Sequence, residues 1–415
     1  MRRPFKSSSA KISSDSQRLA TYARGIALAS SRLEERSWEK HIDALLHKVL
    51  KTAHQDCIDT ALDTLFKSDA NAYDALMEAV EAASEAAVIE HDGQRYDALL
   101  IAVPILAWTR FSIAAGPISA ELHTTLAAHL NAHVLAPDVK LALAPMLYAI
   151  DQLPRTHVET FAVLQRLATT ALKGSAARAS TDVPETAPFL ADTRYLLAAV
   201  VAPAGQPLLR WQASLQVDDR EDALLQWQVQ AMPNIVRLLP GCGVELLLPE
   251  AYYVACREGD RQIRPASIRA AVHFLTHTLE IDARELQVSI GSFSEEPAPG
   301  RADEYRIGFS VGQATDVVYG VVWPLYGEED EDDDSDIGAI PLQRLAVGEE
   351  PQPTPLEQIT TLLREAGVTN IVRHADRFPM EFCEDCHAPM FPDAEADLVH
   401  AEMPEDTPPV ATHFH

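Results

Sequence analysis

Apolar residues recur at helical spacing through residues 17–87, in segments such as LATYARGIALASSRLEE and AYDALMEAVEAASEAA. Side chains three and four positions apart share one face of a helix, so this spacing predicts helices with one apolar face each. Short polar joints separate the segments. The pattern therefore predicts an all-helical region over residues 17–87.

The period changes at VIEHDGQRYDALLIAVPILAW. Asp92-Gly93 is a strong signal for a two-residue hairpin, and the run after it is apolar and contains Val and Ile. Strand and helix patterns then alternate, as in the helix ISAELHTTLAAHLNAH before the strand VKLALAPMLY, and the helix SIRAAVHFLTHTL before the strand ELQVSIGSF. We therefore expect an α/β or α+β fold behind the helical N-terminal region.

Two segments of the chain share one spacing of two histidines and an aspartate. The residues are His129, His133 and Asp138 in the first segment and His273, His277 and Asp282 in the second. Each predicted helix also opens near a Pro-x-Ser sequence, at 117–119 and 265–267, of the kind that caps helices. These parallels predict an internal duplication in which residues 95–145 and 244–291 follow the same β-α-β trace. The alternative is chance similarity between two β-α-β units.

The predicted organisation has six parts. They are a disordered basic arm (1–16), the helical region (17–87), a first α/β repeat unit (88–205), a second α/β repeat unit (206–347), a helix and strand completing that unit (348–380), and a tail with a zinc knuckle (381–415). The second unit includes an acidic loop at 327–338, GEEDEDDDSDIG, in which mutual repulsion favours an extended, solvated chain.

Composition and charge limit the class of protein. A chain of 415 residues with 47% apolar content can bury more than one core. Its net charge of −27 repels phosphate backbones, so direct nucleic-acid binding is disfavoured. It has no run of about 18 apolar residues and no apolar segment behind its basic start, so we expect a cytoplasmic protein without a membrane partner. Five cysteines, an odd number in a long chain, predict reduced thiols.

The stretch CEDCHAPMFPD predicts a metal knuckle. Two cysteines separated by two residues can both bind one zinc ion, and the residue after the second one is often a Gly with positive φ. No second C-x-x-C exists, so histidines must supply the other ligands. The candidate ligands are Cys383, Cys386, His387, His400, His413 and His415. The alternatives are a redox-active pair, which would need a helix N-terminus, and two unliganded thiols in a mobile tail.

Other candidate sites are weaker. His129, His133, His273 and His277 offer two His-x-x-x-His pairs that could build a metal site between the repeats, although histidines at the margin of a packed helix explain the same pattern. Gly241-Cys242-Gly243 is the nearest sequence to a reactive loop, and a tight turn explains it better. No phosphate-binding glycine loop and no nucleophile elbow occur.

Several stretches together resemble an uncharacterised bacterial family, domain of unknown function twenty-eight sixty-three. They are HDGQRYDALLIAVPILAWTRFSI, GPISAEL, AHVLA, DQLP, CEDCHAPMFPD and HAEMPE. The resemblance covers nearly the whole chain and implies a bacterial cytosolic setting, but no activity, ligand or catalytic residue. Our leading hypothesis is a non-enzymatic binding or regulatory protein whose zinc-stabilised tail presents a surface to a protein partner. The competing hypothesis is a metal-dependent enzyme with its site between the repeats; the sequence specifies no small-molecule ligand.

Overall fold

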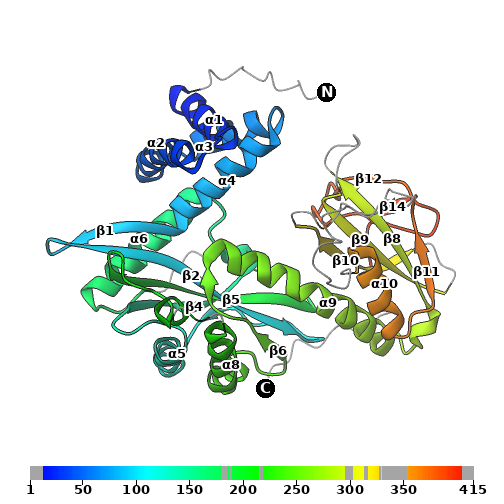
Figure 1. Ribbon diagram of the computed structural model, residues 1–415. Coiled ribbons are helices and arrows are strands. Elements are labelled where there is room, and N and C mark those ends of the chain that lie inside the picture. Colours follow the sequence, from blue (N-terminus) through cyan, green and yellow to red (C-terminus); the bar gives the residue numbers. More distant parts are fainter. Residues whose placement is uncertain are drawn as a thin grey trace.

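The chain forms an N-terminal helical bundle followed by two sheets with their own helices (Figure 1). The computed structural model describes residues 13–403 except 179–185, 187–188, 215, 217, 295–301, 313–315, 327–328 and 330–352. Helices first and sheets afterwards confirm the predicted mixed fold class. The predicted arm up to residue 12 and nearly all of the acidic loop lie outside the described residues. Residues 14–16, predicted to end the arm, instead begin the first helix.

The N-terminal region is helical, as its spacing predicts. Its helices are α1 (Ser14–Ala27), α2 (Arg32–Lys51), α3 (Gln55–Phe66) and α4 (Ala70–Glu85). Ser13, Ser31 and Asp69 cap α1, α2 and α4, because each side chain accepts the backbone N–H of the residue three positions later. Leu19 and Leu65 belong to the apolar cluster that the four helices share.

The first sheet is antiparallel and has seven strands in the described part of the chain. They are β1 (Ala86–His91), β2 (Gln94–Trp108), β3 (Gly116–Pro117), β4 (Lys140–Ala149), β5 (Ala191–Pro203), β6 (Gly243–Leu246) and β7 (Glu250–Ala251). The order is β1-β2-β5-β4-β3, with β6 and β7 paired to β2. Asp92 and Gly93 have φ of 49° and 75°, the left-handed values of a two-residue hairpin turn, so the predicted β1–β2 hairpin is confirmed.

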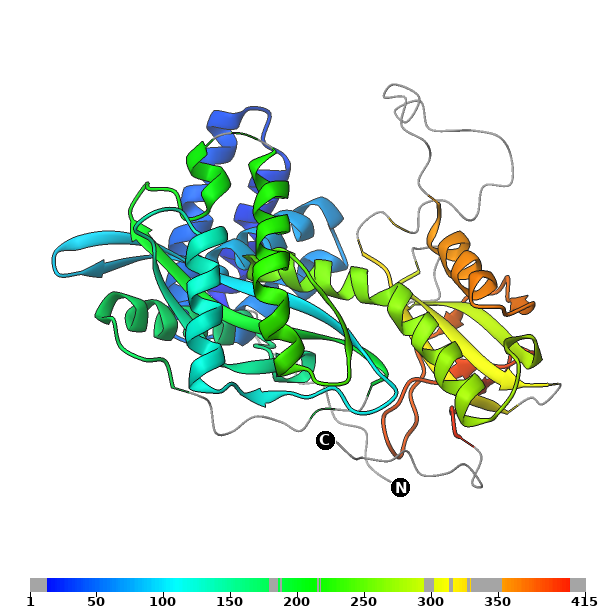
Figure 2. The ribbon, with the colours of Figure 1, turned by 90° about the horizontal axis from the view of Figure 1, so that it is seen from below.

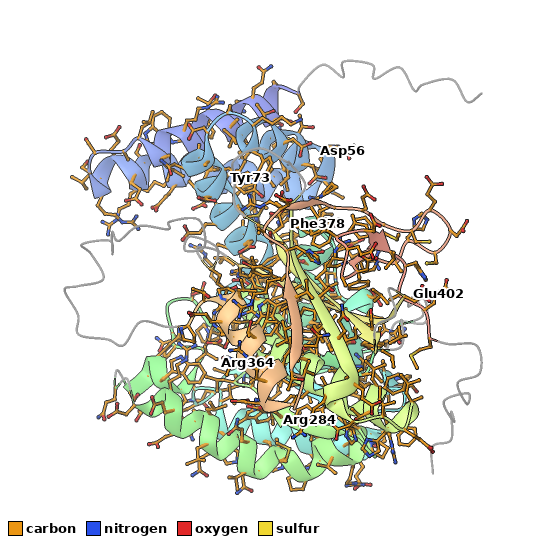
Figure 3. The ribbon with its side chains drawn as sticks, turned by 90° about the vertical axis from the view of Figure 1, so that its right-hand side faces the viewer. Asp56, Tyr73, Arg284, Arg364, Phe378 and Glu402 are labelled. Atoms are coloured by element: carbon orange, nitrogen blue, oxygen red, sulfur yellow. The ribbon has the colours of Figure 1, made fainter. Side chains whose placement is uncertain are left out.

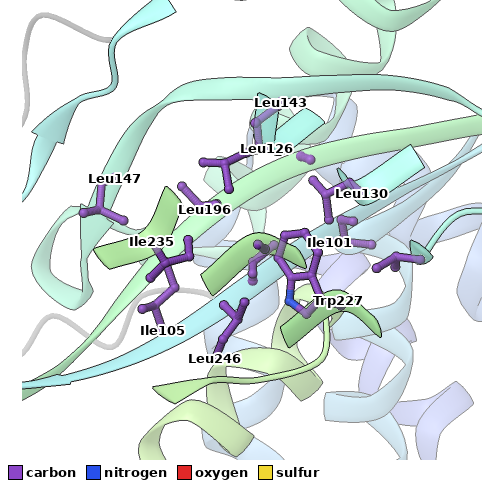
Figure 4. Close-up of a cluster of buried hydrophobic side chains, with 14 of the residues drawn as sticks. Ile101, Ile105, Leu126, Leu130, Leu143, Leu147, Leu196, Trp227, Ile235 and Leu246 are labelled. Atoms are coloured by element: carbon purple, nitrogen blue, oxygen red, sulfur yellow. The ribbon is translucent and has the colours of Figure 1, made fainter. Parts of the chain in front are cut away.

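Helices cover both faces of this sheet. They are α5 (Ala120–His133), α6 (His157–Lys173), α7 (Arg210–Ser214), α8 (Asp219–Leu238) and the start of α9 (Tyr252–Thr278), with a short 3-10 turn η1 at Ile150–Gln152. Alternate residues of β2 point to opposite faces. Ile101 and Ile105 pack with α5 and α8, the two helices on one face (Figures 2 and 4). Leu100 packs with α6 on the other face. Burial on both faces explains why β2 is a continuous apolar run from Ala98 to Trp108.

The second sheet lies at the far end of α9 (Figure 1). Its strands are β8 (Leu286–Ser294), β9 (Glu304–Val311), β10 (Val317–Pro324), β11 (Asn370–Arg373) and β12 (Phe378–Pro379). The order is β10-β9-β8-β11, and β12 continues the edge beyond β11. The C-terminal half of α9, the 3-10 turn η2 (Ala283–Glu285) and α10 (Pro355–Glu365) pack against it. None of the described helices combines the length and apolar character needed to cross a membrane.

The predicted duplication is wrong. In the first segment β2 and β4 belong to one sheet, whereas in the second β6 belongs to the first sheet and β8 to the second. Residues 244–251, predicted to open the second β-α-β trace, therefore complete the first sheet. Pro265 does not start a helix, because it lies inside α9, where Ser267 Oγ donates to the carbonyl of Ile263 instead of capping an N-terminus. The two segments have similar spacings of apolar residues, which suggested a repeat, but their strands pair differently.

A partly buried polar contact ties the helical region to α9. Glu85, the last residue of α4, accepts the backbone N–H of Tyr253 at 2.9 Å. The Tyr253 hydroxyl in turn lies 3.1 Å from Ser84 Oγ and 3.2 Å from Thr160 Oγ1. Burial raises the pKa of Glu85 to about 7. A carboxyl group whose pKa is raised in the folded state stabilises the fold below its unfolded pKa, and this contribution is lost as the pH rises through about 7.

Glu85→Gln is therefore expected to stabilise the protein at pH 8 by about 1–3 kcal/mol, because Gln keeps an acceptor for Tyr253 and cannot ionise. The measurement is the free energy of unfolding in denaturant at pH 5 and pH 8. Between pH 5 and pH 8 the free energy of unfolding should decrease less in the variant than in the wild type. Glu78→Gln, at an exposed position of the same helix, is the matched control. Equal effects of the two substitutions would contradict the role given to Glu85.

Candidate metal centre

The turn at CEDC closes as the knuckle prediction requires. Residues 384–386 form the turn, the backbone N–H of Cys383 donates to the carbonyl of Ala388 at 2.8 Å, and the N–H of His387 donates to the carbonyl of Cys383 at 2.9 Å. His387 has φ of 59°. This is the left-handed conformation expected where related knuckles carry Gly. His387 thus shapes the turn with its backbone, while its side chain is exposed.

Three predicted ligands come together at this turn. One ligand atom each from Cys383, Cys386 and His400 lies within 4.8 Å of the others, and Cys386 Sγ lies 3.1 Å from His400 Nε2. In the part of the chain that the structure describes, no other group of three or more His, Cys, Asp or Glu side chains is close enough to hold a metal ion. The arrangement can supply two sulfur ligands and one nitrogen ligand to a single ion.

Backbone donors prepare the first sulfur for metal binding. The N–H of Cys386, followed by that of Asp385, donates to Cys383 Sγ and holds the pKa of the Cys383 thiol below its usual value. The thiolate, and not the thiol, is the form that ligates a metal. A redox-active pair would need a helix N-terminus, but the pair lies in a turn between the bridged residues Phe382 and Pro389. The geometry therefore favours a metal knuckle over thiol–disulfide exchange.

A small hairpin brings His400 back to the cysteines. Its strands are β13 (Phe391–Pro392) and β14 (Leu398–Val399), which pair antiparallel. The side chain of Asp393 accepts the N–H groups of Glu395 and Asp397 at 2.8 and 2.9 Å and so fixes the connecting turn. His400 directly follows β14. This return explains how a ligand fourteen residues beyond Cys386 reaches the same point.

The second nitrogen of His400 faces a carboxylate. His400 Nδ1 lies 3.1 Å from Glu402 Oε1, is buried, and makes no aligned hydrogen bond with the described residues. The N–H of Glu402 donates to the carbonyl of Val317 on β10 at 2.9 Å, which anchors this segment to the second sheet (Figure 3). Carboxylates in this position orient the imidazole ligands of metal sites. One ring nitrogen of His400 therefore faces the Cys386 sulfur, and the other faces a carboxylate. This arrangement fits a metal ligand better than a surface histidine.

Arg306 clamps the knuckle to the second sheet. Its side chain is fully buried on β9 and donates to the carbonyl oxygens of Glu381 and Met390 at 2.6 and 2.8 Å, on either side of the cysteine turn. Glu304 Oε1 accepts from Arg306 Nε at 2.6 Å, so the buried charge is paired. The guanidinium carbon also lies 5.0 Å from the ring centre of Phe382. The knuckle is thus part of the second sheet's packing and not a free tail.

Gly320 provides the space into which the hairpin packs. A Cβ at this position of β10 would overlap the ring of Phe391, which is buried. Gly320→Ala is therefore expected to push the β13–β14 hairpin outwards and to weaken metal binding about tenfold or more, because His400 would shift relative to the two sulfurs. Competition for zinc with a chromophoric chelator measures the effect. Unchanged zinc affinity together with unchanged stability would show that the hairpin does not depend on this contact.

The other predicted ligands have different outcomes. His387 does not join the group of three, and its side chain is exposed. His413 and His415 lie outside the described residues. The three described ligands would fill three of the four positions of a tetrahedral metal ion. A further residue or a solvent molecule would fill the fourth.

The four histidines of the two His-x-x-x-His pairs do not form a metal site. His129 and His133 lie half-buried on α5, with ring centres 6.0 Å apart, and His273 and His277 are exposed on α9. None of them belongs to a group of metal-ligating side chains in the described residues. The predicted metal site between two repeats is therefore wrong, since α5 and α9 belong to different packing environments and not to two copies of one unit.

Cys242 occupies a turn, as the flanking glycines suggest. Gly241 has φ of 77°, and the N–H of Cys242 donates to the carbonyl of Leu239. Burial raises the pKa of the Cys242 thiol. A half-buried thiol with a raised pKa is a poor nucleophile, which favours the structural interpretation of this sequence.

Sequence reasoning did not find Arg306 or Glu402. An arginine between the apolar residues Tyr305 and Ile307 of a strand was the available signal for Arg306, because a buried charge needs partners. Glu402 had no comparable signal. Its role depends on the register of a two-residue strand pair.

The chain belongs to the family described as protein of unknown function (DUF2863), whose family profile matches residues 4–414. This confirms the suspected family over nearly the whole length. No curated protein and no solved structure matches the chain.

Proposed function

We propose that this protein is a non-enzymatic binding protein whose C-terminal knuckle, residues 381–403, folds around one zinc ion and contacts a protein partner. The observation that carries the proposal is the group Cys383, Cys386 and His400. It lies on a turn that is open on its outer side and clamped to the second sheet on its inner side by Arg306. Metal binding at this point would fix the shape of an exposed surface.

The donor set favours zinc. Two thiolates and an imidazole suit the borderline-soft Zn²⁺ ion, whereas Mg²⁺ and Ca²⁺ prefer oxygen ligands. The N–H groups that donate to Cys383 Sγ stabilise the negative charge of the thiolate, the form of cysteine that binds a metal ion. His387, His413 and His415 are the candidates for the fourth ligand, which would close the site as structural zinc sites are closed.

The surface beside the knuckle has the composition of a protein contact. Phe382 directly precedes Cys383 and is 53% exposed, an unusual state for a large aromatic side chain. Glu384, Asp385 and His387 are exposed around it. An exposed aromatic side chain within a polar rim is the arrangement of an interface anchor. We therefore place the partner contact at Phe382 and the outer side of the turn.

Capture by the intact chain tests this function. The zinc-loaded protein is immobilised and incubated with an extract of the cells that express it, and retained proteins are identified by mass spectrometry. The comparison uses the wild type, Phe382→Ala, and Phe66→Ala as a matched control, since Phe66 is 60% exposed on the distant helix α3. We expect at least one protein retained by the wild type and the control but not by Phe382→Ala.

The proposed contact would be contradicted if the wild type and both variants retained the same proteins. It would also be contradicted if the wild type retained only the proteins that bind to bare resin. A Cys383→Ser/Cys386→Ser chain separates the two parts of the proposal. Retention by this chain equal to the wild type would mean that the contact does not require the metal.

A further inference from the structure

We propose that the groove between the end of β2 and helix α9 binds a small molecule with an aromatic ring and a phosphate monoester group. The site is separate from the knuckle and goes beyond the proposed function. The groove has a volume of about 620 Å³. The lining side chains that matter are Trp108, Arg110, Phe111, Arg269, His273 and His277.

The charge of the lining opposes the charge of the chain. The protein has 61 acidic and 34 basic residues, yet the described residues that line this groove include two arginines and two histidines and no Asp or Glu. In a strongly acidic protein, a groove whose permanently charged lining residues are both arginines attracts anions against the overall field. An anionic ligand is therefore the chemistry that this groove selects.

Arg110 is unpaired among the described residues, and Arg269 is held only by an exposed ion pair. Arg110 forms no ion pair with any residue that the structure describes. Arg269 has one contact, to Glu365 at 3.5 Å, in which both side chains are 59% exposed. Solvent screens an exposed pair of this kind, so an anion can replace it at little cost. Two guanidinium groups match the charge of a phosphate monoester, which is close to −2 at neutral pH.

The histidines add donors on the same side. His273 and His277 lie one turn apart on α9, with ring centres 4.1 Å apart. The Nδ1 atom of His277 lies 3.1 Å from the carbonyl oxygen of His273, so a proton on Nδ1 can bond within the helix and Nε2 remains for a ligand. Burial, the neighbouring His277 and Arg110 lower the pKa of His273. Arg110 and His273 both line the groove, so one anion bound in it faces both side chains.

The aromatic part of the ligand follows from Trp108 and Phe111. Trp108 packs over Gly243, where a Cβ would overlap the indole, so the ring position is set by the adjacent strand. Phe111 lies beside the Arg110 guanidinium, 5.5 Å from the ring centre. Thr109, between them, donates to the carbonyl of Gly241 at 3.2 Å and holds the segment in place. Two preorganised rings next to a cationic cluster suit a ligand with a flat ring beside its phosphate.

Calorimetric titration of the full chain with phenyl phosphate tests the site, with inorganic phosphate and phenol as separate arms. We expect phenyl phosphate to bind in the millimolar range or tighter, and about tenfold tighter than either fragment, because ring and phosphate contacts act together. Arg110→Gln should weaken binding about tenfold. Arg36→Gln, which removes an exposed charge on α2, should leave it unchanged.

Three results would overturn the proposal. They are no binding of phenyl phosphate at about 10 mM, equal affinities of phenyl phosphate and inorganic phosphate, and equal effects of the Arg110 and Arg36 substitutions. The histidine ring signals of the ¹⁵N-labelled chain give a second measurement, since His277 should shift on titration in the wild type and should need about tenfold more ligand to shift in Arg110→Gln. Thermal unfolding of each variant shows whether it is folded.

Discussion

Arg306→Met is expected to release the C-terminal knuckle from the second sheet and to lower the free energy of unfolding by about 3–5 kcal/mol. The guanidinium is fully buried and pairs with Glu304, so its loss leaves a carboxylate with 15% exposure without its cation. The carbonyl oxygens of Glu381 and Met390 lose their donors at the same time. Unpaired buried acceptors carry their full desolvation penalty, which makes this the largest stability effect that we expect from one substitution.

Unfolding in denaturant measures the stability change, and hydrogen exchange of residues 381–403 measures the release of the knuckle. Arg364→Met is the matched control, because Arg364 is exposed on α10 of the same half (Figure 3). The knuckle should exchange faster in Arg306→Met alone. A loss below about 1 kcal/mol, with unchanged exchange, would mean that the clamp does not hold the knuckle.

Cys383→Ser/Cys386→Ser is expected to lower zinc affinity at least about a thousandfold, because a structural zinc site gains about 10–16 kcal/mol from four ligands and two would be lost. The variant should resemble the chelator-treated wild type, with a faster-exchanging knuckle and unchanged signals from the first sheet. Competition with a chromophoric chelator measures the affinity. Cys57→Ser/Cys242→Ser, which removes two thiols outside the group, is the control. Equal affinities of the two double variants would exclude the cysteine turn as the site.

Local sequence signals predicted the parts of the fold that depend on near neighbours. Asp92-Gly93 marks the β1–β2 hairpin because few other residues adopt positive φ at two successive positions. The continuous apolar run of β2 follows from burial on both faces of the sheet. The cysteine spacing predicted the group of Cys383 and Cys386, and His387, named only as a candidate ligand, has a positive φ where related knuckles carry Gly. The hairpin turn and the cysteine turn each depend on residues that are close together in the sequence.

Sequence signals failed where a choice between distant partners decides the structure. The apolar pattern of β6 and β8 does not say which sheet each strand joins, so an apparent repeat was inferred from two similar periods. Pro265 has the pattern of a helix start, but packing against both sheets carries α9 through it. The choice of His400 among the candidate ligands depends on the β13–β14 register. These contacts are long-range, and periodicity does not encode them.

The most direct test of the zinc knuckle is elemental analysis combined with X-ray absorption at the zinc edge, on full-length protein purified without a histidine tag. We predict about one zinc per chain. Its first shell should contain two sulfur atoms near 2.3 Å and nitrogen near 2.0–2.1 Å, from Cys383, Cys386 and His400. Protein that contains negligible metal, or zinc surrounded by oxygen and nitrogen without sulfur, would contradict the account.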